Sequence, residues 1–189
     1  MWAKGRDAVV MHRLVARTIR DRLERAGALD TALGAVADAL TLIGVSEQQA
    51  WDHREAGLEL VGHATALWTI ALPAADRGAL PPDSVEAQAD LAAWAVRHLI
   101  ATADLSRAAE LGASVLRETE RVLGPDHPDT LTSRNNLALA YQTAGNLTQA
   151  IPLHERTLAD RERILGTDHP TTKTVGSNLR AARAARREP

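Results

Sequence analysis

The sequence predicts an all-α fold, a right-handed α-α superhelix with an N-terminal helical portion, and three observations support this class. Hydrophobic residues make up 45% of the 189 residues but aromatic residues only 3%, so the core must be built mainly from Ala, Leu and Val. Ala and Leu are strong helix formers, whereas a β-sandwich needs β-branched and aromatic residues. Apolar residues recur largely at helical spacing, and one segment repeats after 42 residues.

The N-terminal half is predicted to form three helices, over residues 9–25, 28–43 and 47–72. The first has an apolar stripe opposite an arginine-rich side. The second keeps its apolar residues in register, and the third is less regular. The apolar residues in step are, helix by helix, Met11, Leu14, Val15, Ile19 and Leu23; Leu29, Leu33, Val36, Leu40 and Ile43; and Leu60, Ala64, Leu67 and Ala71.

The C-terminal half contains an internal repeat. The motif Leu-Gly-Pro-Asp-His-Pro at residues 123–128 recurs as Leu-Gly-Thr-Asp-His-Pro at residues 165–170, an offset of 42 residues. Asn136 and Asn178, each followed by Leu, lie at the same offset. In both copies the proline suits the first turn of a helix, where its missing N–H costs nothing. The glycine suits the position just after a helix, where φ is often positive. Each copy of the motif therefore separates one helix from the next.

These anchors divide the second half into helix pairs. Asp83 or Ser84 is the expected N-cap of the first helix. A last, arginine-rich helix is expected to cap the array. The expected helices span residues 85–102 and 105–123 in the first repeat, 130–143 and 147–165 in the second, and 170 to about 187 in the cap. The predicted organisation is an N-terminal helix at 1–27, a helical connector at 28–80 that packs on the array, and an array at 83–187, divided into about 83–127, 128–169 and the capping helix 170–187.

The repeat carries a resemblance to a known family. Residues 120–158, ERVLGPDHPDTLTSRNNLALAYQTAGNLTQAIPLHERTL, closely resemble the 42-residue tetratricopeptide repeats of the kinesin light chain type, and the resemblance covers residues 85–187. It implies that the first helix of each repeat lines a concave groove that holds extended peptides, often through asparagine side chains.

The resemblance also assigns residues to that groove. Asn136 and Asn178 match the family's groove asparagine, and Trp94 takes this position in the first repeat, which would make that end of the groove apolar. Arg134 and Asn135 are neighbouring groove candidates. The alternative is that Asn136 and Asn178 only form hydrogen bonds between adjacent helices, because a buried amide needs a partner and a neighbouring backbone can supply one.

A second resemblance lies near the N-terminus. Val-Val-Met-His-Arg-Leu-Val at residues 9–15 resembles the end of the winged-helix part of STAND-class signalling ATPases of the NB-ARC type, so 1–27 would contain a winged-helix remnant. His12 matches the histidine that touches the ADP phosphate in that family, and Trp51 to Trp68 is similar to its helical connector. Because no G-x-x-x-x-G-K-S/T loop occurs, His12 is expected only as a vestigial nucleotide contact. The chain resembles the C-terminal piece of such an ATPase or a stand-alone descendant, and a separately encoded signalling ATPase is a candidate partner.

Other chemistries are poorly supported by the sequence. No cysteine is present, and no G-x-S-x-G motif occurs, so we expect no catalytic site and no cofactor. His127 and His169 occupy equivalent turn positions and lack the further ligands of a zinc site, so no metal site is expected. No apolar run approaches membrane-spanning length, and the cytoplasm is the expected location.

The sequence thus favours a protein-interaction module that binds a peptide or protein segment in its repeat groove, in a bacterial-type signalling or regulatory system. The competing hypothesis is a regulator that contacts nucleic acid through Arg13, Arg17 and Arg20 of the first helix. Against it stand a formal net charge of −2 and few aromatic side chains for base stacking near that helix. Both a monomer and a homodimer are compatible with an array of this size.

Overall fold

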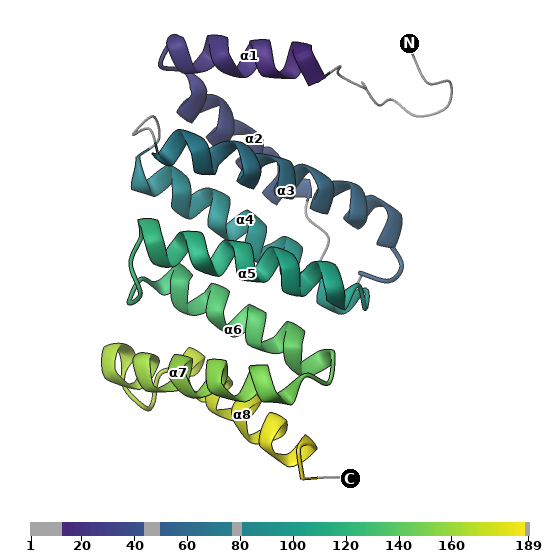
Figure 1. The fold of residues 1–189 in the computed structure, drawn as a ribbon, viewed down its shortest axis with the longest axis vertical. Coiled ribbons are helices and arrows are strands. Elements are labelled where there is room, and N and C mark those ends of the chain that lie inside the picture. The colour runs from purple at the N-terminus through teal and green to yellow at the C-terminus, as the bar shows by residue number, and fades with distance from the viewer. Residues whose placement is uncertain (1–12, 44–49, 77–80, 188–189) are drawn as a thin grey trace.

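The computed structural model describes residues 13–43, 50–76 and 81–187, and within these ranges every regular element is an α-helix. The helices stack in chain order, with α1 at one end of the molecule and α8 at the other (Figure 1). The all-α prediction is therefore confirmed. The helices are α1 (Arg13–Arg25), α2 (Leu29–Ile43), α3 (Arg54–Asp76), α4 (Pro82–Ala101), α5 (Leu105–Val122), α6 (Pro128–Thr143), α7 (Leu147–Leu165) and α8 (Pro170–Ala185).

The backbone turns between helices repeat with the same 42-residue offset as the sequence motif. Gly124 and Gly166, which end α5 and α7, have φ of 93° and 87°. Between the helices of each pair, Ala103 and Gly145 have φ of 59° and 77°. Positive φ at equivalent positions shows that α4–α5 and α6–α7 are two copies of one helix pair, and α8 occupies the first place of a third.

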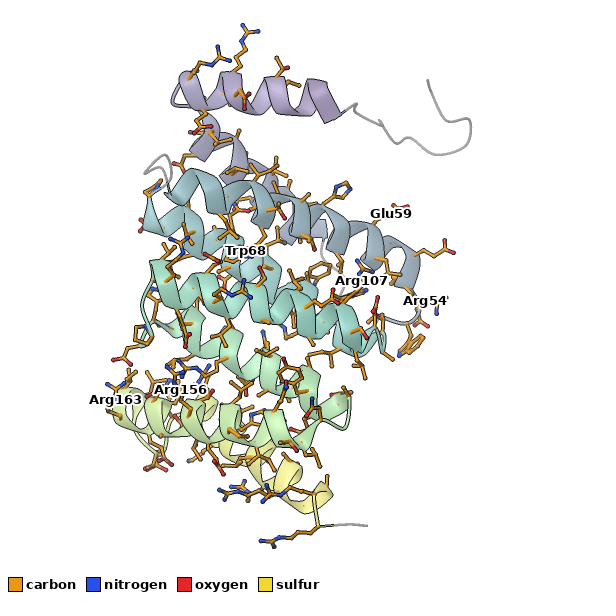
Figure 2. All side chains as sticks on the ribbon, in the orientation of Figure 1. Arg54, Glu59, Trp68, Arg107, Arg156 and Arg163 are labelled. Atoms are coloured by element: carbon orange, nitrogen blue, oxygen red, sulfur yellow. The ribbon has the colours of Figure 1, made fainter. Side chains whose placement is uncertain are left out.

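The N-terminal helices share their core with the first repeat. One cluster of buried side chains extends from Leu29 to Ala140 and includes residues of α2, α3, α4, α5 and α6. Trp68 of α3, nearly fully buried, points toward α5, where its Nε1 donates a hydrogen bond of 3.4 Å to Ser114 Oγ (Figure 2). Gln88 of α4 donates through Nε2 to the backbone oxygen of Leu33 at 3.3 Å. Helices α2 and α3 thus cover the side of the first pair that faces the N-terminus.

Several predicted details differ from the structure. Residues 50–53 form a turn and α3 begins at Arg54, so the prediction of a helix from residue 47 onward is wrong for residues 50–53. Helix α4 begins three residues early, and Pro81 is its N-cap without a side-chain bond. Ser84, an expected cap, instead donates its hydroxyl to Asp30 Oδ1 of α2. Tertiary packing on α2 takes precedence there over the local capping preference.

The buried face of α2 is also shifted by one position. Val36 is 45% exposed, whereas Ala37 is buried with Leu29 and Leu33. The helical period allows either residue at that point, and the small side chain lies on the buried side. In α1, Ile19 is exposed, although it belongs to the apolar stripe that was predicted to be buried. Leu23 of the same stripe packs against the core.

Helix α8 presents polar residues at positions that α6 buries. Leu131 and Ala138 are buried in α6. Their equivalents at the 42-residue offset are Lys173 and Arg180, and both are exposed. Terminal units of repeat arrays need such a polar outer face, and this supports the interpretation of α8 as a capping helix.

Candidate binding face

The first helices of the pairs, α4, α6 and α8, carry partly exposed residues at equivalent positions. On α6 these are spaced three and four residues apart, which places them on one side of the helix. Repetition of the helix pair gives their equivalents the same orientation on α4 and α8. We call this set the A-helix face. It consists of Asp90 and Arg97 of α4, Thr132, Asn135 and Leu139 of α6, and Thr174, Ser177 and Ala181 of α8, together with Trp94 and Asn178, the partly exposed equivalents of the buried Asn136.

Two asparagines connect α6 and α8 on this face. Asn178 Nδ2 donates a hydrogen bond of 3.3 Å to Asn135 Oδ1, and both side chains are partly exposed. The bond uses one hydrogen of Asn178 and one lone pair of Asn135. An asparagine side chain offers two donors and an acceptor, so the Nδ2 of Asn135 and the Oδ1 of Asn178 can still bind another group.

Asn136 lies one repeat earlier than Asn178 and has no such bond. It is 4% exposed, and its Nδ2 has no hydrogen-bond partner among the described residues. The cause is visible at the repeat offset, because the position equivalent to Asn135 on α4 is Ala93, which offers no side-chain acceptor. An unpaired buried polar group costs about 1–3 kcal/mol of stability. The sequence alone shows this difference between the two repeats, because residue 93 is alanine where residue 135 is asparagine.

Arg134 does not belong to the A-helix face, contrary to the expectation from the family. Its side chain is fully buried, and it forms ion pairs with Glu120 of α5 at 2.9 Å and Asp160 of α7 at 2.6 Å. Arg156 of α7 joins the same Glu120 carboxylate at 3.3 Å. Arg134 therefore holds three helices together and is not available to a ligand.

Trp94 forms an aromatic patch with His98 on α4. The two rings stack with centroids 5.3 Å apart and an interplanar angle of 27°. His98 is buried, neither ring nitrogen has a partner among the described residues, and burial lowers the pKa of its imidazole. A neutral ring behind a partly exposed indole gives this end of the A-helix face an aromatic patch between the charged side chains of Asp90 and Arg97.

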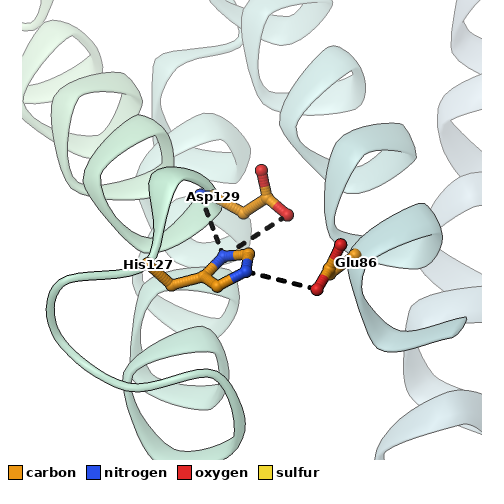
Figure 3. Close-up of side chains that lie close together, drawn as sticks. All are labelled: Glu86, His127 and Asp129. Atoms are coloured by element: carbon orange, nitrogen blue, oxygen red, sulfur yellow. Dashed lines mark hydrogen bonds and ion pairs between the residues drawn. The ribbon is translucent and has the colours of Figure 1, made fainter. Parts of the chain in front are cut away.

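A cluster of ionisable side chains lies at the start of α6 (Figure 3). His127 caps the helix, because its Nδ1 accepts the backbone N–H of Asp129 at 3.3 Å. Its Nε2 lies 3.2 Å from Glu86 Oε1 of α4, and the Asp129 carboxylate lies 3.7 Å from Nδ1. Glu86 was not predicted as a site residue, because it precedes His127 by 41 residues and belongs to no sequence motif.

Two sequence predictions fall outside what the structure describes. His12 lies outside the described residues, as do the side chains of Arg13, Arg17 and Arg20, although α1 itself begins at Arg13. The vestigial nucleotide contact and the nucleic-acid surface therefore stay predictions. A search of the described helices found none with the length and apolarity to span a bilayer.

Stacked helix pairs with a 42-residue period define the class of all-helical repeat proteins. A family model for the tetratricopeptide repeat matches residues 98–129 and 130–171. Together with the stacked helix pairs, this match supports tetratricopeptide repeats in this part of the chain. No curated protein matches the chain. Tetratricopeptide repeats generally mediate contacts between proteins and are typically non-enzymatic scaffolds, so the fold implies a protein partner.

Proposed function

We propose that this protein binds a peptide or protein segment in a concave groove along its A-helix face, as part of a bacterial-type signalling or regulatory system. The observation that carries the proposal is the chemistry of partly exposed side chains on the first helices of the pairs, α4, α6 and α8. Asn135 and Asn178 present amides with unused donors and acceptors, and Trp94 presents an indole. Amides can bind a peptide backbone regardless of its sequence, while an aromatic surface selects an apolar side chain.

The face also suggests how a segment would be oriented. Its α4 end carries the aromatic patch of Trp94 on a neutral His98, between Asp90 and Arg97, whereas its α6–α8 end carries the two asparagine amides. A bound segment would place an apolar anchor near α4 and its backbone along α6 and α8. Asn136 is nearly buried and would reach a ligand only after its side chain turns, when a ligand carbonyl could pair its Nδ2.

The test is a pull-down from source lysate with the bound proteins identified by mass spectrometry. The variant Trp94→Ala/Asn178→Ala removes both ends of the proposed contact. The matched control is Glu110→Ala/Arg117→Ala, which changes two exposed side chains of α5, away from the A-helix face. We expect a protein that wild type and control capture and the Trp94/Asn178 variant loses, while all three melt cooperatively. Equal capture by all three would rule out the A-helix face as the binding site.

The family resemblance makes a separately encoded signalling ATPase the first partner to examine in that experiment. A low-salt electrophoretic shift assay separates the proposal from the nucleic-acid alternative. Protein recognition predicts no shift with double-stranded DNA or RNA. A shift lost in Arg13→Ala/Arg17→Ala/Arg20→Ala would instead favour a nucleic-acid regulator.

A further inference from the structure

Three side chains with metal-ligating atoms converge where α4 meets the start of α6. Glu86 comes from α4, and His127 and Asp129 come from the first residues of α6 (Figure 3). One ligand atom from each lies within 4.8 Å of the other two, and all three side chains are half-buried. Residues from two helices thus form one pocket of imidazole and carboxylate groups.

The two carboxylates are not needed for the turn that His127 makes. His169, its equivalent one repeat later, caps α8 in the same way, with Nδ1 accepting the N–H of Thr171 at 3.3 Å. There the residue in the place of Asp129 is Thr171, which provides no carboxylate. The repeat motif therefore explains the histidine and a polar side chain two residues later, since the Thr171 hydroxyl lies 2.8 Å from His169 Nδ1, but it requires neither the carboxylate of Asp129 nor Glu86.

The distance between the His127 and Glu86 ligand atoms suits a shared ion, and the Asp129 carboxylate, 3.7 Å from Nδ1, would have to turn toward Nε2 to join them. His127 Nε2 and Glu86 Oε1 are 3.2 Å apart. Two ligand atoms at about 2.1 Å from a tetrahedral ion lie roughly 3.4 Å from each other, so an ion could bind both after small side-chain shifts. The charge around the site is also unbalanced. Two carboxylates, those of Glu86 and Asp129, flank the single imidazole of His127. A cation would relieve the repulsion between these carboxylates.

We propose that Glu86, His127 and Asp129 bind a divalent transition-metal ion such as Zn²⁺, with a fourth position open to water. An imidazole ligand favours Zn²⁺ over Mg²⁺ or Ca²⁺, which prefer all-oxygen sites. Because a neutral imidazole carries one proton, binding through Nε2 moves that proton to Nδ1. The cap bond from the Asp129 N–H is then given up. The ion would join the first helices of both repeats, independently of any peptide on the A-helix face.

The experiment is a calorimetric titration of the tag-free, metal-stripped full chain with Zn²⁺ at neutral pH. It compares wild type with Glu86→Gln, with His127→Asn and with His169→Asn. Asparagine is a good N-cap, so both histidine variants retain a capping residue. Glu86→Gln changes a partly exposed side chain that caps no helix, so it carries the test if His127→Asn fails to fold. Nitrogen-15 NMR of the His127 ring reports which nitrogen holds the proton.

We expect wild type and His169→Asn to bind one Zn²⁺ with the same affinity, and Glu86→Gln and His127→Asn to bind at least tenfold more weakly. Zinc should raise the melting temperature of wild type but not of Glu86→Gln. The proton of His127 should move from Nε2 to Nδ1 on binding. Equal affinity in wild type and Glu86→Gln, or no saturable binding by wild type, would overturn the proposal and leave a simple His127–Glu86 hydrogen bond.

Discussion

At the scale of the residue, the contact between Gly57 of α3 and His98 of α4 shows how the N-terminal helices fit the repeats. A Cβ atom on Gly57 would overlap Cε1 and Nε2 of the His98 ring. His98 is buried and stacked on Trp94, so its ring has no open space to move into. The glycine is therefore required by the close approach of the imidazole, and its φ has no part in this requirement.

Gly57→Ala should consequently destabilise the protein by about 1–3 kcal/mol, the usual cost of overpacking. The control is Gly62→Ala on the same helix, where an added Cβ meets no atom within 4 Å. That change should leave stability unchanged or raise it by about 0.5–1 kcal/mol, because alanine favours the helix over glycine. Urea denaturation of both variants measures the difference. Equal free energies of unfolding would show that His98 does not restrict residue 57.

The sequence could predict some residues of the site but not their surroundings. The 42-residue offset placed Asn136 and Asn178 correctly at equivalent positions. It could not show that Asn178 bonds to Asn135 while Asn136 lacks a partner, because that depends on which neighbouring helix each amide meets. Arg134 was misassigned for a similar reason: its carboxylate partners come from two other helices.

At the scale of the element, Arg134 shows that the two repeats are packed differently. The side chain fills the space between α5, α6 and α7. The equivalent residue of α8 is Gly176, and between α7 and α8 a cavity of about 180 Å³ lies beside it, next to the carboxylate of Glu162. Glu162 is itself the equivalent of Glu120. The interface between α7 and α8 thus keeps one carboxylate of the cluster, Glu162 of α7, with glycine in place of the arginine.

Arg134→Met should destabilise the protein by about 2–4 kcal/mol, because Glu120 and Asp160 would keep their charges without the buried guanidinium. The control is Arg163→Met on α7, whose side chain is 56% exposed and pairs with Asp126 and Asp160. Water solvates that pair well, so little or no change is expected there. Thermal and urea denaturation of both variants would measure the two losses of stability. Comparable losses would mean that burial of Arg134 adds nothing to the ion pairs.

Helix limits could be predicted from the sequence only where proline or glycine marks them. Sequence signals located α5, α6, α7 and α8 to within two residues, because Gly and Pro at the 42-residue period mark their ends. The start of α3 was misplaced, since residues 50–53 carry no comparable proline or glycine and their apolar spacing imitates a helix.

At the scale of the whole molecule, the shared core predicts that the repeats depend on the N-terminal helices. Buried residues of α2 and α3 belong to the same cluster as those of α4 and α5. Removing them would take away part of the cluster that surrounds buried residues of α4 such as Ala89 and Val96. Two helix pairs alone bury little surface, because each repeat depends on its neighbours for stability.

A fragment lacking residues 1–80 should therefore aggregate or lose cooperative melting. Size-exclusion chromatography and a circular-dichroism melt, run beside the full chain, measure both properties. A monomeric fragment with a sharp transition would show that residues 81–187 fold independently, and the N-terminal helices would then be a separate unit.

The charged outer side of α8 has a consequence for self-assembly. Identical units that stack head to tail without closing a ring polymerise into filaments, and an array with an open apolar end is at risk of doing so. Here a second copy adding to α8 would have to bury Lys173 and Arg180, where α6 has Leu131 and Ala138. Desolvating Lys173, which pairs with Asp168 at 3.0 Å, together with the guanidinium of Arg180 would cost free energy and oppose that growth.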